Sequence, residues 1–228
     1  MTGAVTRAEE ITARLADVNG RIAAAATRSG RSPASVLLVA VGKTHPLSDL
    51  LAAYAAGARA FGENRVQEAE EKFPGLPPDA AGHLIGPLQS NKVNRAVKAA
   101  AVIQTIDTED LARRLDRAAA ASGKRLAVFV QVRLGGEATK SGVEPADAAA
   151  LVAAVRALGA LDLRGLMTIP PPGETRPHFA ALRKLGESLG LSELSMGMSD
   201  DFEAAVEEGA TLVRVGSAIF GERRREIS

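Results

Sequence analysis

The chain has 228 residues, a formal net charge of +1 and no cysteine. The near-neutral charge gives no electrostatic case for a nucleic-acid partner or an anionic membrane, and the lack of cysteine excludes disulfides, thiolate zinc sites and cysteine nucleophiles. Hydrophobic residues make up 46% of the chain and aromatic residues only 3%, so a sizeable core must be built from Ala, Val, Leu and Ile.

The first predicted element is an amphipathic helix near the N-terminus. Thr6 and Glu9 have the spacing of a capping box, and Gly30 is a signal for the end of a helix. Between them, apolar residues recur on one helical face: Ile11, Leu15, Val18, Ile22 and Ala25. We expect residues 1–30 to form a helical extension of the same domain as the rest of the chain.

After this helix, short apolar runs alternate with helical patterns. Eight runs have the length and composition of buried strands: 37–43, 60–66, 83–89, 102–107, 127–134, 163–169, 193–199 and 212–220. The helical patterns are 48–56, 66–72, 91–98, 109–122, 145–158, 175–189 and 200–208. The alternation predicts parallel strands with right-handed crossovers. Eight strands in this length predict an α/β fold, a (β/α)8 TIM barrel. An open doubly wound sheet is the alternative.

Lys43 ends the first predicted strand. In a TIM barrel, binding groups lie at the C-terminal ends of the strands, so we expect Lys43 at the mouth. Val39, Val41 and Lys43 share one face of the strand. If that face lines the barrel interior, the amine points over the barrel axis. An amine beside apolar walls is favoured in its neutral, nucleophilic form, as a Schiff base requires. The alternative is a lysine that only ends a strand and extends to water.

A second group of residues follows the last two predicted strands. Ser199, Gly216 and Ser217 offer hydroxyls, backbone N–H groups and little bulk, which suits a phosphate site in these loops. Arg214 lies within an apolar strand, and its partner could be a ligand phosphate, a ligand ring atom or an internal carboxylate. An amine and a phosphate site in one mouth suit pyridoxal 5′-phosphate (PLP) or a phosphosugar in a Schiff-base aldolase.

Seven segments in order carry a family resemblance that spans nearly the whole chain. They are residues 41–46, 61–68, 83–92, 136–142, 164–167, 194–201 and 213–221. By these segments the chain resembles the pyridoxal phosphate homeostasis protein family. Two positions depart from the family pattern: Arg65 stands where Tyr is frequent, and Gly42 stands where Ser is common. Neither departure removes a group that binds the cofactor directly.

The resemblance implies a PLP fold of type III, like the N-terminal domain of alanine racemase. It implies PLP carried as an internal aldimine on Lys43 and a function in intracellular PLP (vitamin B6) homeostasis. It also implies a set of cofactor-binding residues and no metal. In this set Ser199, Gly216 and Ser217 hold the phosphate, and Asn64, Met198 and Arg214 line the cofactor.

We expect no dedicated catalytic activity. Racemisation needs two positioned bases, and the chain offers Lys43 with no evident second base. The single tyrosine, Tyr54, falls in the helix after the first strand, and the chain ends seven residues after Gly221, which leaves no room for a second domain. We expect His45 to be solvent-exposed, with a position at the mouth as the alternative. We expect His83 to be structural, at the strand end opposite the mouth, with a catalytic role as the alternative. A weak amino-acid racemase and a phosphosugar aldolase are the alternatives.

The remaining expectations concern partners and location. The N-terminus lacks a signal peptide and no run approaches a membrane span, so we expect a cytoplasmic protein with no nucleic-acid or membrane partner. We expect one domain over residues 1–228, a monomer, and PLP-dependent apoenzymes as transient recipients of the cofactor. Lys140, after the fifth strand, is a second amine near the rim, and a solvated lysine is the favoured interpretation.

Overall fold

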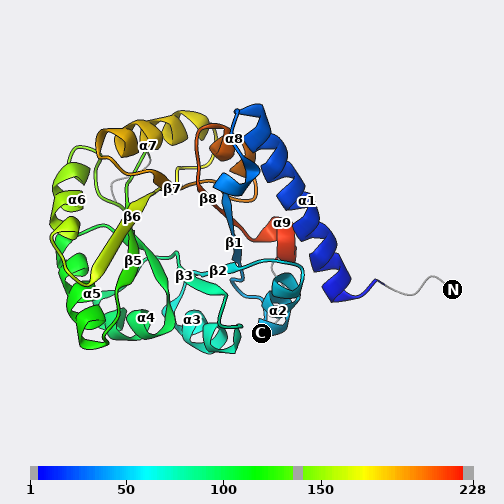
Figure 1. Ribbon diagram of the computed structural model, residues 1–228, viewed down its shortest axis with the longest axis horizontal. Coiled ribbons are helices and arrows are strands. Elements are labelled where there is room, and N and C mark those ends of the chain that lie inside the picture. Colours follow the sequence, from blue (N-terminus) through cyan, green and yellow to red (C-terminus); the bar gives the residue numbers. More distant parts are fainter. Residues whose placement is uncertain (1–4, 136–140, 223–228) are drawn as a thin grey trace.

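Eight parallel strands close into a barrel in chain order (Figure 1). This computed structural model describes residues 5–135 and 141–222. The strands are β1 (Leu37–Val41), β2 (Ala60–Glu63), β3 (Ala81–Leu84), β4 (Val102–Ile106), β5 (Leu126–Gln131), β6 (Leu161–Met167), β7 (Glu193–Ser195) and β8 (Leu212–Val215). The ring closes between β8 and β1, with Leu37 opposite Leu212 and Ala40 opposite Val215. The predicted TIM barrel is confirmed.

Helices surround the barrel (Figure 1). They are α1 (Arg7–Arg28), α2 (Leu47–Ala55), α3 (Val66–Lys72), α4 (Val93–Ala99), α5 (Glu109–Ala121), α6 (Ala148–Arg156), α7 (Arg176–Ser188), α8 (Phe202–Glu207) and α9 (Ser217–Phe220). Single 3-10 turns occur at Pro33–Ser35, Phe73–Gly75 and Ser90–Lys92. Within the described ranges, none of these helices combines the length and apolar character needed to cross a bilayer.

The apolar core has two parts. The larger part fills the layer between the strands and the helices. The smaller part lies inside the barrel and consists of Val39, Ala60, Phe129, Met167 and Leu212. Because Val39 belongs to the inner cluster, the face of β1 that it shares with Val41 lines the barrel interior, which meets the condition set for an amine that points over the barrel axis.

The N-terminal helix α1 lies outside the barrel, beside α2, α8 and α9 (Figure 1). Thr6 caps it as predicted: its hydroxyl accepts from the Glu9 N–H, and the Glu9 carboxylate accepts from the Thr6 N–H at 2.7 Å. The predicted apolar face is buried against the neighbouring helices. Arg7 Nη2 donates to the Phe220 carbonyl at 2.7 Å, which ties α1 to the helix that follows the last strand.

The predicted strands extend too far at their C-terminal ends. The largest difference is at the end of the chain, where β8 stops at Val215 and Ser217–Phe220 form helix α9. Gly216, with φ −117° and ψ −75°, makes the turn between them. In the same way β3 ends at Leu84 and β7 at Ser195. The residues that follow are apolar or small, yet several of them line a cavity instead of pairing in the sheet.

Candidate functional site

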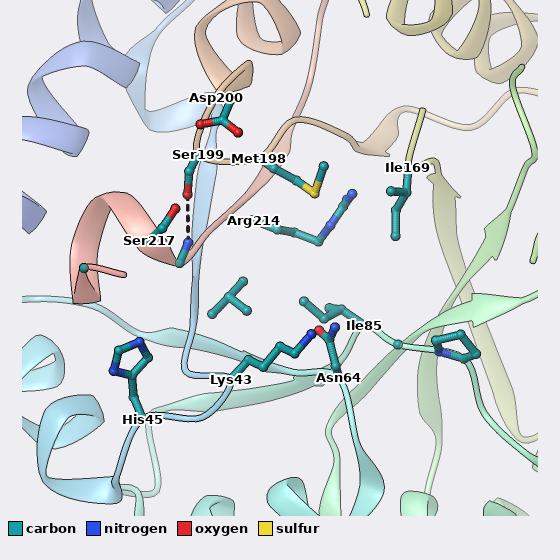
Figure 2. Close-up of a pocket in the computed structure, with 15 residues that line it drawn as sticks. Lys43, His45, Asn64, Ile85, Ile169, Met198, Ser199, Asp200, Arg214 and Ser217 are labelled. Atoms are coloured by element: carbon teal, nitrogen blue, oxygen red, sulfur yellow. Dashed lines mark hydrogen bonds between the residues drawn. The ribbon is translucent and has the colours of Figure 1, made fainter. Parts of the chain in front are cut away.

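One cavity at the C-terminal ends of the strands gathers all the residues that the sequence singles out for a cofactor (Figure 2). Its volume is about 370 Å³, within the range of small-molecule sites. Lys43 follows β1, Asn64 follows β2, Met198 and Ser199 follow β7, and Arg214, Gly216 and Ser217 lie on and after β8. Their common location agrees with a barrel mouth, and their roles toward a ligand stay predictions.

Lys43 and Asn64 form one wall of the cavity. Figure 2 shows the Lys43 side chain extending into the cavity, with its amine next to the Asn64 side chain. The ends of β1 and β2 are held together here, since the Gly42 N–H donates to the Gly62 carbonyl at 3.0 Å. Directly after Lys43, Thr44 has φ 65°, in a region that residues other than glycine rarely adopt. Lys43 therefore stands on a sharp, strained turn.

Small groups with hydrogen-bond donors form the wall near β8. Ser199 Oγ accepts from the backbone N–H groups of Gly216 at 3.3 Å and Ala218 at 3.4 Å. A Cβ at Gly216 would lie 3.1 Å from the Val41 carbonyl oxygen, so a side chain there would press on β1. These two N–H groups converge on Ser199 Oγ, and the hydroxyls of Ser199 and Ser217 can donate to a ligand from the same wall of small residues. That is the donor set that a phosphate group needs.

Arg214 borders the same cavity and is only 3% exposed. Its Nη1 donates to Ser195 Oγ at 2.6 Å and its Nη2 to the Thr168 carbonyl at 2.8 Å. Burial lowers the pKa of its guanidinium to about 10. Within residues 5–135 and 141–222 its hydrogen-bond partners are neutral, and Asp201 acts on it only through the electrostatic field, which partly opposes the effect of burial on its pKa. A buried cation held by neutral acceptors retains charge that an anionic ligand can offset.

A hydrogen-bonded chain continues behind Arg214 into the barrel. Ser195 Oγ donates to Gln104 Oε1 at 2.7 Å, and Gln104 Nε2 lies 2.9 Å from His83 Nδ1. Burial lowers the pKa of His83 to about 4, so the ring is neutral at neutral pH and Nδ1 accepts the hydrogen bond. The prediction that His83 begins a strand opposite the mouth is wrong. It lies within β3 and supports Arg214 through two intermediate side chains.

His45 also differs from its prediction. It is 8% exposed instead of solvent-exposed, and it borders the cavity. Its ring lies 5.2 Å from the Phe220 ring, and its Nδ1 lies 3.5 Å from Asp49 Oδ2. Burial lowers the pKa of His45. The loop position alone indicated exposure, but α9 covers the ring, and α9 is the helix that the sequence pattern did not predict. Tyr54 is not a cavity residue; its hydroxyl donates to Asp79.

The sequence reasoning singled out Glu63 at the end of the second strand, but it missed Lys72, the charged partner of Glu63 behind the Lys43 turn. Lys72 Nζ donates to Glu63 Oε1 and to the Gly42 carbonyl, both at 2.9 Å. Glu63 is fully buried, and burial raises its pKa to about 8. A lysine in the last turn of a short helix is ordinarily read as solvated, so only the i, i+4 spacing of Glu68 and Lys72 could have indicated a pair. Lys140 lies outside the described residues.

Comparison with known proteins shows which family model and which relatives the chain matches. Residues 15–224 match the family model of the N-terminal domain of alanine racemase. The pyridoxal phosphate homeostasis protein of Pseudomonas aeruginosa is 46% identical over 222 residues, which cover 93% of this chain and 96% of the relative.

Two solved structures extend the comparison. PipY of Synechococcus elongatus, solved with PLP bound, is 43% identical with a TM-score of 0.80, over 92% of this chain and 100% of that chain. Alanine racemase of Corynebacterium glutamicum is 18% identical with a TM-score of 0.70, over 94% of this chain and 63% of that one. The second likeness concerns the fold alone.

Proposed function

The chain belongs to the pyridoxal phosphate homeostasis protein family, and we propose that it binds PLP at the barrel mouth and serves PLP homeostasis. One observation carries the proposal. An amine, a buried guanidinium and a set of anion donors border a single cavity of about 370 Å³. PLP has an aldehyde, which can react with the amine, and a phosphate, which the anion donors can bind.

The residues of the cavity fit this cofactor. When bound, PLP supplies an aldehyde that forms a reversible covalent bond with an amine. Lys43 has its amine inside the cavity and holds the cofactor through it. Ser199, Gly216 and Ser217 bind the phosphate through hydroxyl and backbone N–H groups, without side chains that would block it. Three further residues line the cofactor: Asn64, Met198 and Arg214.

We propose a carrier without a dedicated substrate. Among the residues that the structure describes, four titratable side chains border the cavity: Lys43, His45, Asp200 and Arg214. Arg214 keeps its proton at neutral pH, because the pKa of its guanidinium is about 10 even after burial. His45 is neutral and can accept a proton, but its Nδ1 faces Asp49 and its ring packs on Phe220. Asp200, the remaining one, is exposed to solvent. Among the described residues, none of these groups other than Lys43 is therefore a base aimed into the cavity, which supports a carrier over a racemase.

Absorbance spectroscopy tests PLP binding at Lys43. We expect the wild type to take up about one equivalent of PLP with visible absorption, and borohydride to fix a pyridoxyl group on the Lys43 peptide. Lys43→Ala should abolish both signals, while Lys98→Ala, an exposed lysine of α4, should keep both. A wild type that stays colourless after PLP is added contradicts the proposal. Trapping of a phosphosugar on Lys43 without a chromophore would indicate the aldolase instead.

The second candidate function is a weak amino-acid racemase. It is favoured by the position of His45, a group that can act as a base, at the border of the cavity. Incubation with a single enantiomer of an amino acid decides between the two. We expect no turnover above that of free PLP. Turnover well above this background, lost in both Lys43→Ala and His45→Ala, would establish the racemase.

The proposal includes a cellular setting. We propose that the chain is a single-domain, monomeric, cytoplasmic protein that passes PLP to apoenzymes. Support comes from the continuous barrel, in which every strand pairs with the next. Light scattering measures the oligomeric state. Activation of a PLP-dependent apoenzyme by the loaded protein, compared with an equal amount of free PLP, measures the transfer.

A further inference from the structure

A buried charged cluster lies directly behind the turn that carries Lys43. It consists of Glu63 at the end of β2 and of Glu68 and Lys72 on α3. Lys72 Nζ lies 2.9 Å from Glu63 Oε1 and 3.6 Å from Glu68 Oε2. The side chains of Glu63, Glu68 and Lys72 are 0%, 18% and 7% exposed. One ammonium group therefore faces two carboxyl groups where water has little access.

Two carboxyl oxygens of the cluster have no hydrogen-bond partner among the described groups. They are Glu63 Oε2 and Glu68 Oε2, and both are buried. Two carboxylates beside one ammonium group repel each other, and a proton on one of them supplies the donor that neither carboxylate has. Burial, reinforced by Glu68, raises the pKa of Glu63 to about 8. With the proton on Glu63, the Glu68 carboxylate and the Lys72 ammonium form a neutral pair.

The cluster contacts the backbone next to Lys43. Lys72 Nζ donates to the Gly42 carbonyl, directly before Lys43, at 2.9 Å. On the other side, the backbone N–H of Thr44 helps to lower the pKa of Glu68. Thr44 has φ 65°, and a side chain in this region persists only where its surroundings hold it. The backbone passes close to the cluster, since a Cβ at Gly42 would lie 2.9 Å from Glu63 Oε1.

Other charged groups reach the cluster from two directions. Arg65, just before α3, acts electrostatically on Glu68, and Lys72 acts on His45 at the start of α2. Lys43 itself extends from the turn into the cavity (Figure 2). These neighbours are cationic or neutral, so within the ranges that the structure describes the Glu63 proton depends on Glu63, Glu68 and Lys72 themselves.

We propose that Glu63, Glu68 and Lys72 form a clamp that fixes the turn carrying Lys43 through the Gly42 carbonyl and so directs the Lys43 amine into the cavity. They are positioning residues, because they act on Lys43 through its backbone. The inference rests on the proposed function for the identity of the ligand, while the clamp itself belongs to the ligand-free protein. Loss of the Glu63 proton places two carboxylates together and loosens the turn.

Two substitutions test the Lys72 ammonium group and the Glu63 proton one at a time. Lys72→Met removes the ammonium group and keeps the length of the side chain. Glu63→Gln mimics the protonated glutamic acid, since its amide donates to Glu68 and its carbonyl accepts from Lys72. The first readout is acylation of Lys43 in the ligand-free protein, measured by peptide mapping relative to Lys98. The second is PLP affinity, measured by absorbance.

We expect Lys72→Met to raise the labelling of Lys43 relative to Lys98 and to weaken PLP affinity by about tenfold or more, since small displacements of a reacting group are costly. At pH 7, Glu63→Gln should resemble the wild type in both readouts. In the wild type the labelling ratio should rise more steeply once the pH passes about 8, the pKa of Glu63. Glu63→Gln should lack this additional rise.

Leu115→Ala, in the buried face of α5, controls for a general loss of stability and should leave the labelling ratio unchanged. The clamp is refuted if folded Lys72→Met keeps the wild-type ratio and affinity, if Leu115→Ala shifts the ratio equally, or if Glu63→Gln retains the wild-type pH profile. If the wild type takes up no PLP, the proposed function fails, and the labelling ratios still decide on the clamp.

Discussion

Arg214 illustrates how a single residue can serve a ligand more than the fold. Its guanidinium is buried against the Ser195 hydroxyl and the Thr168 carbonyl, both neutral groups. Keeping a charge in such surroundings has a desolvation cost that two hydrogen bonds only partly offset. A bound anion or an acceptor on a ligand ring offsets the rest. The residue is therefore expected to contribute more to affinity than to stability.

Replacing Arg214 tests this division. We expect Arg214→Met to change the free energy of unfolding of the ligand-free protein by less than about 1 kcal/mol, because the lost hydrogen bonds and the removed charge oppose each other. PLP affinity should fall by about tenfold or more, the value of a charge-assisted hydrogen bond. Urea denaturation and absorbance titration measure the two quantities.

Arg31→Met is a matched control, since Arg31 also donates to a backbone carbonyl, that of Val206, but far from the cavity residues. It should alter stability and leave PLP affinity unchanged. If Arg214→Met instead loses much stability and keeps normal PLP affinity, Arg214 serves to stabilise the fold and not to bind the ligand.

Glu63 links stability to pH. Its pKa rises from an ordinary 4.5 to about 8 because it is buried. Between these values the folded protein binds a proton that the unfolded chain has released, so the free energy of unfolding falls as the pH rises through this window. The stabilisation from the Glu63 proton is fully present below pH 4.5 and is lost as the pH rises through about 8.

Denaturation at about pH 5.5 and about pH 8.5 measures this linkage. Relative to Glu63→Gln, the wild type should lose more than about 1.4 kcal/mol between the two, the equivalent of a tenfold change in proton affinity. Parallel pH profiles for the two proteins would show that Glu63 does not hold the proton.

Site residues can be predicted from the sequence when their position relative to an apolar strand already indicates a function. Lys43 follows an apolar strand and Arg214 lies within another, while Ser199 and Gly216 follow the last two strands, where barrels often bind phosphate. Lys72 is not predicted because its environment is made by a strand end nine residues earlier and by the Gly42 carbonyl. Burial of this kind depends on tertiary packing that no periodicity records.

At the scale of elements, the sequence predicts the order of the helices and strands but overextends the strands. The last strand is the clearest case, since Ser217–Phe220 continue an apolar run yet form helix α9. A run this short fits both a strand and a buried helical turn. Tertiary packing selects the helix, because Ile219 and Phe220 are buried in the large core and Arg7 of α1 donates to the Phe220 carbonyl.

The helix α1 is therefore expected to stabilise the barrel at its closure. Leu15 lies in the middle of its buried face, so Leu15→Ala should leave a cavity and lower the free energy of unfolding by about 2–5 kcal/mol. Asp17→Ala, on the exposed face of the same helix, should change it by no more than about 0.5 kcal/mol. Urea denaturation compares them, and equal effects would mean that α1 is only loosely attached.

At the scale of the whole molecule, the alternating pattern predicts the barrel because a parallel sheet needs a crossover between each pair of strands. The sequence does not show how charge is distributed over the closed barrel. A second cavity of about 650 Å³ adjoins the first and shares Lys43 and Asn64 with it. Its wall also contains Arg65, Lys92 and Glu68, so cationic side chains outnumber the single carboxyl group at the approach to the Lys43 amine.

This local charge should speed the entry of PLP. The net charge of +1 provides almost no attraction over the whole protein, so any attraction for the anionic cofactor arises near the mouth. We expect the double variant Arg65→Gln/Lys92→Gln to slow PLP association severalfold at low salt, measured by stopped-flow absorbance. The difference should shrink above about 0.1 M salt, where screening acts over about 10 Å.

A matched variant separates local from total charge. Arg113→Gln/Arg114→Gln on α5 also removes two positive charges, taking +1 to −1, but Arg113 and Arg114 pair with carboxylates outside the mouth. If attraction is local, this variant associates with PLP at the wild-type rate. If both double variants slow association equally, the total charge governs entry and the second cavity has no role in it. The comparison works because the barrel keeps α5 and the mouth on separate parts of one rigid scaffold.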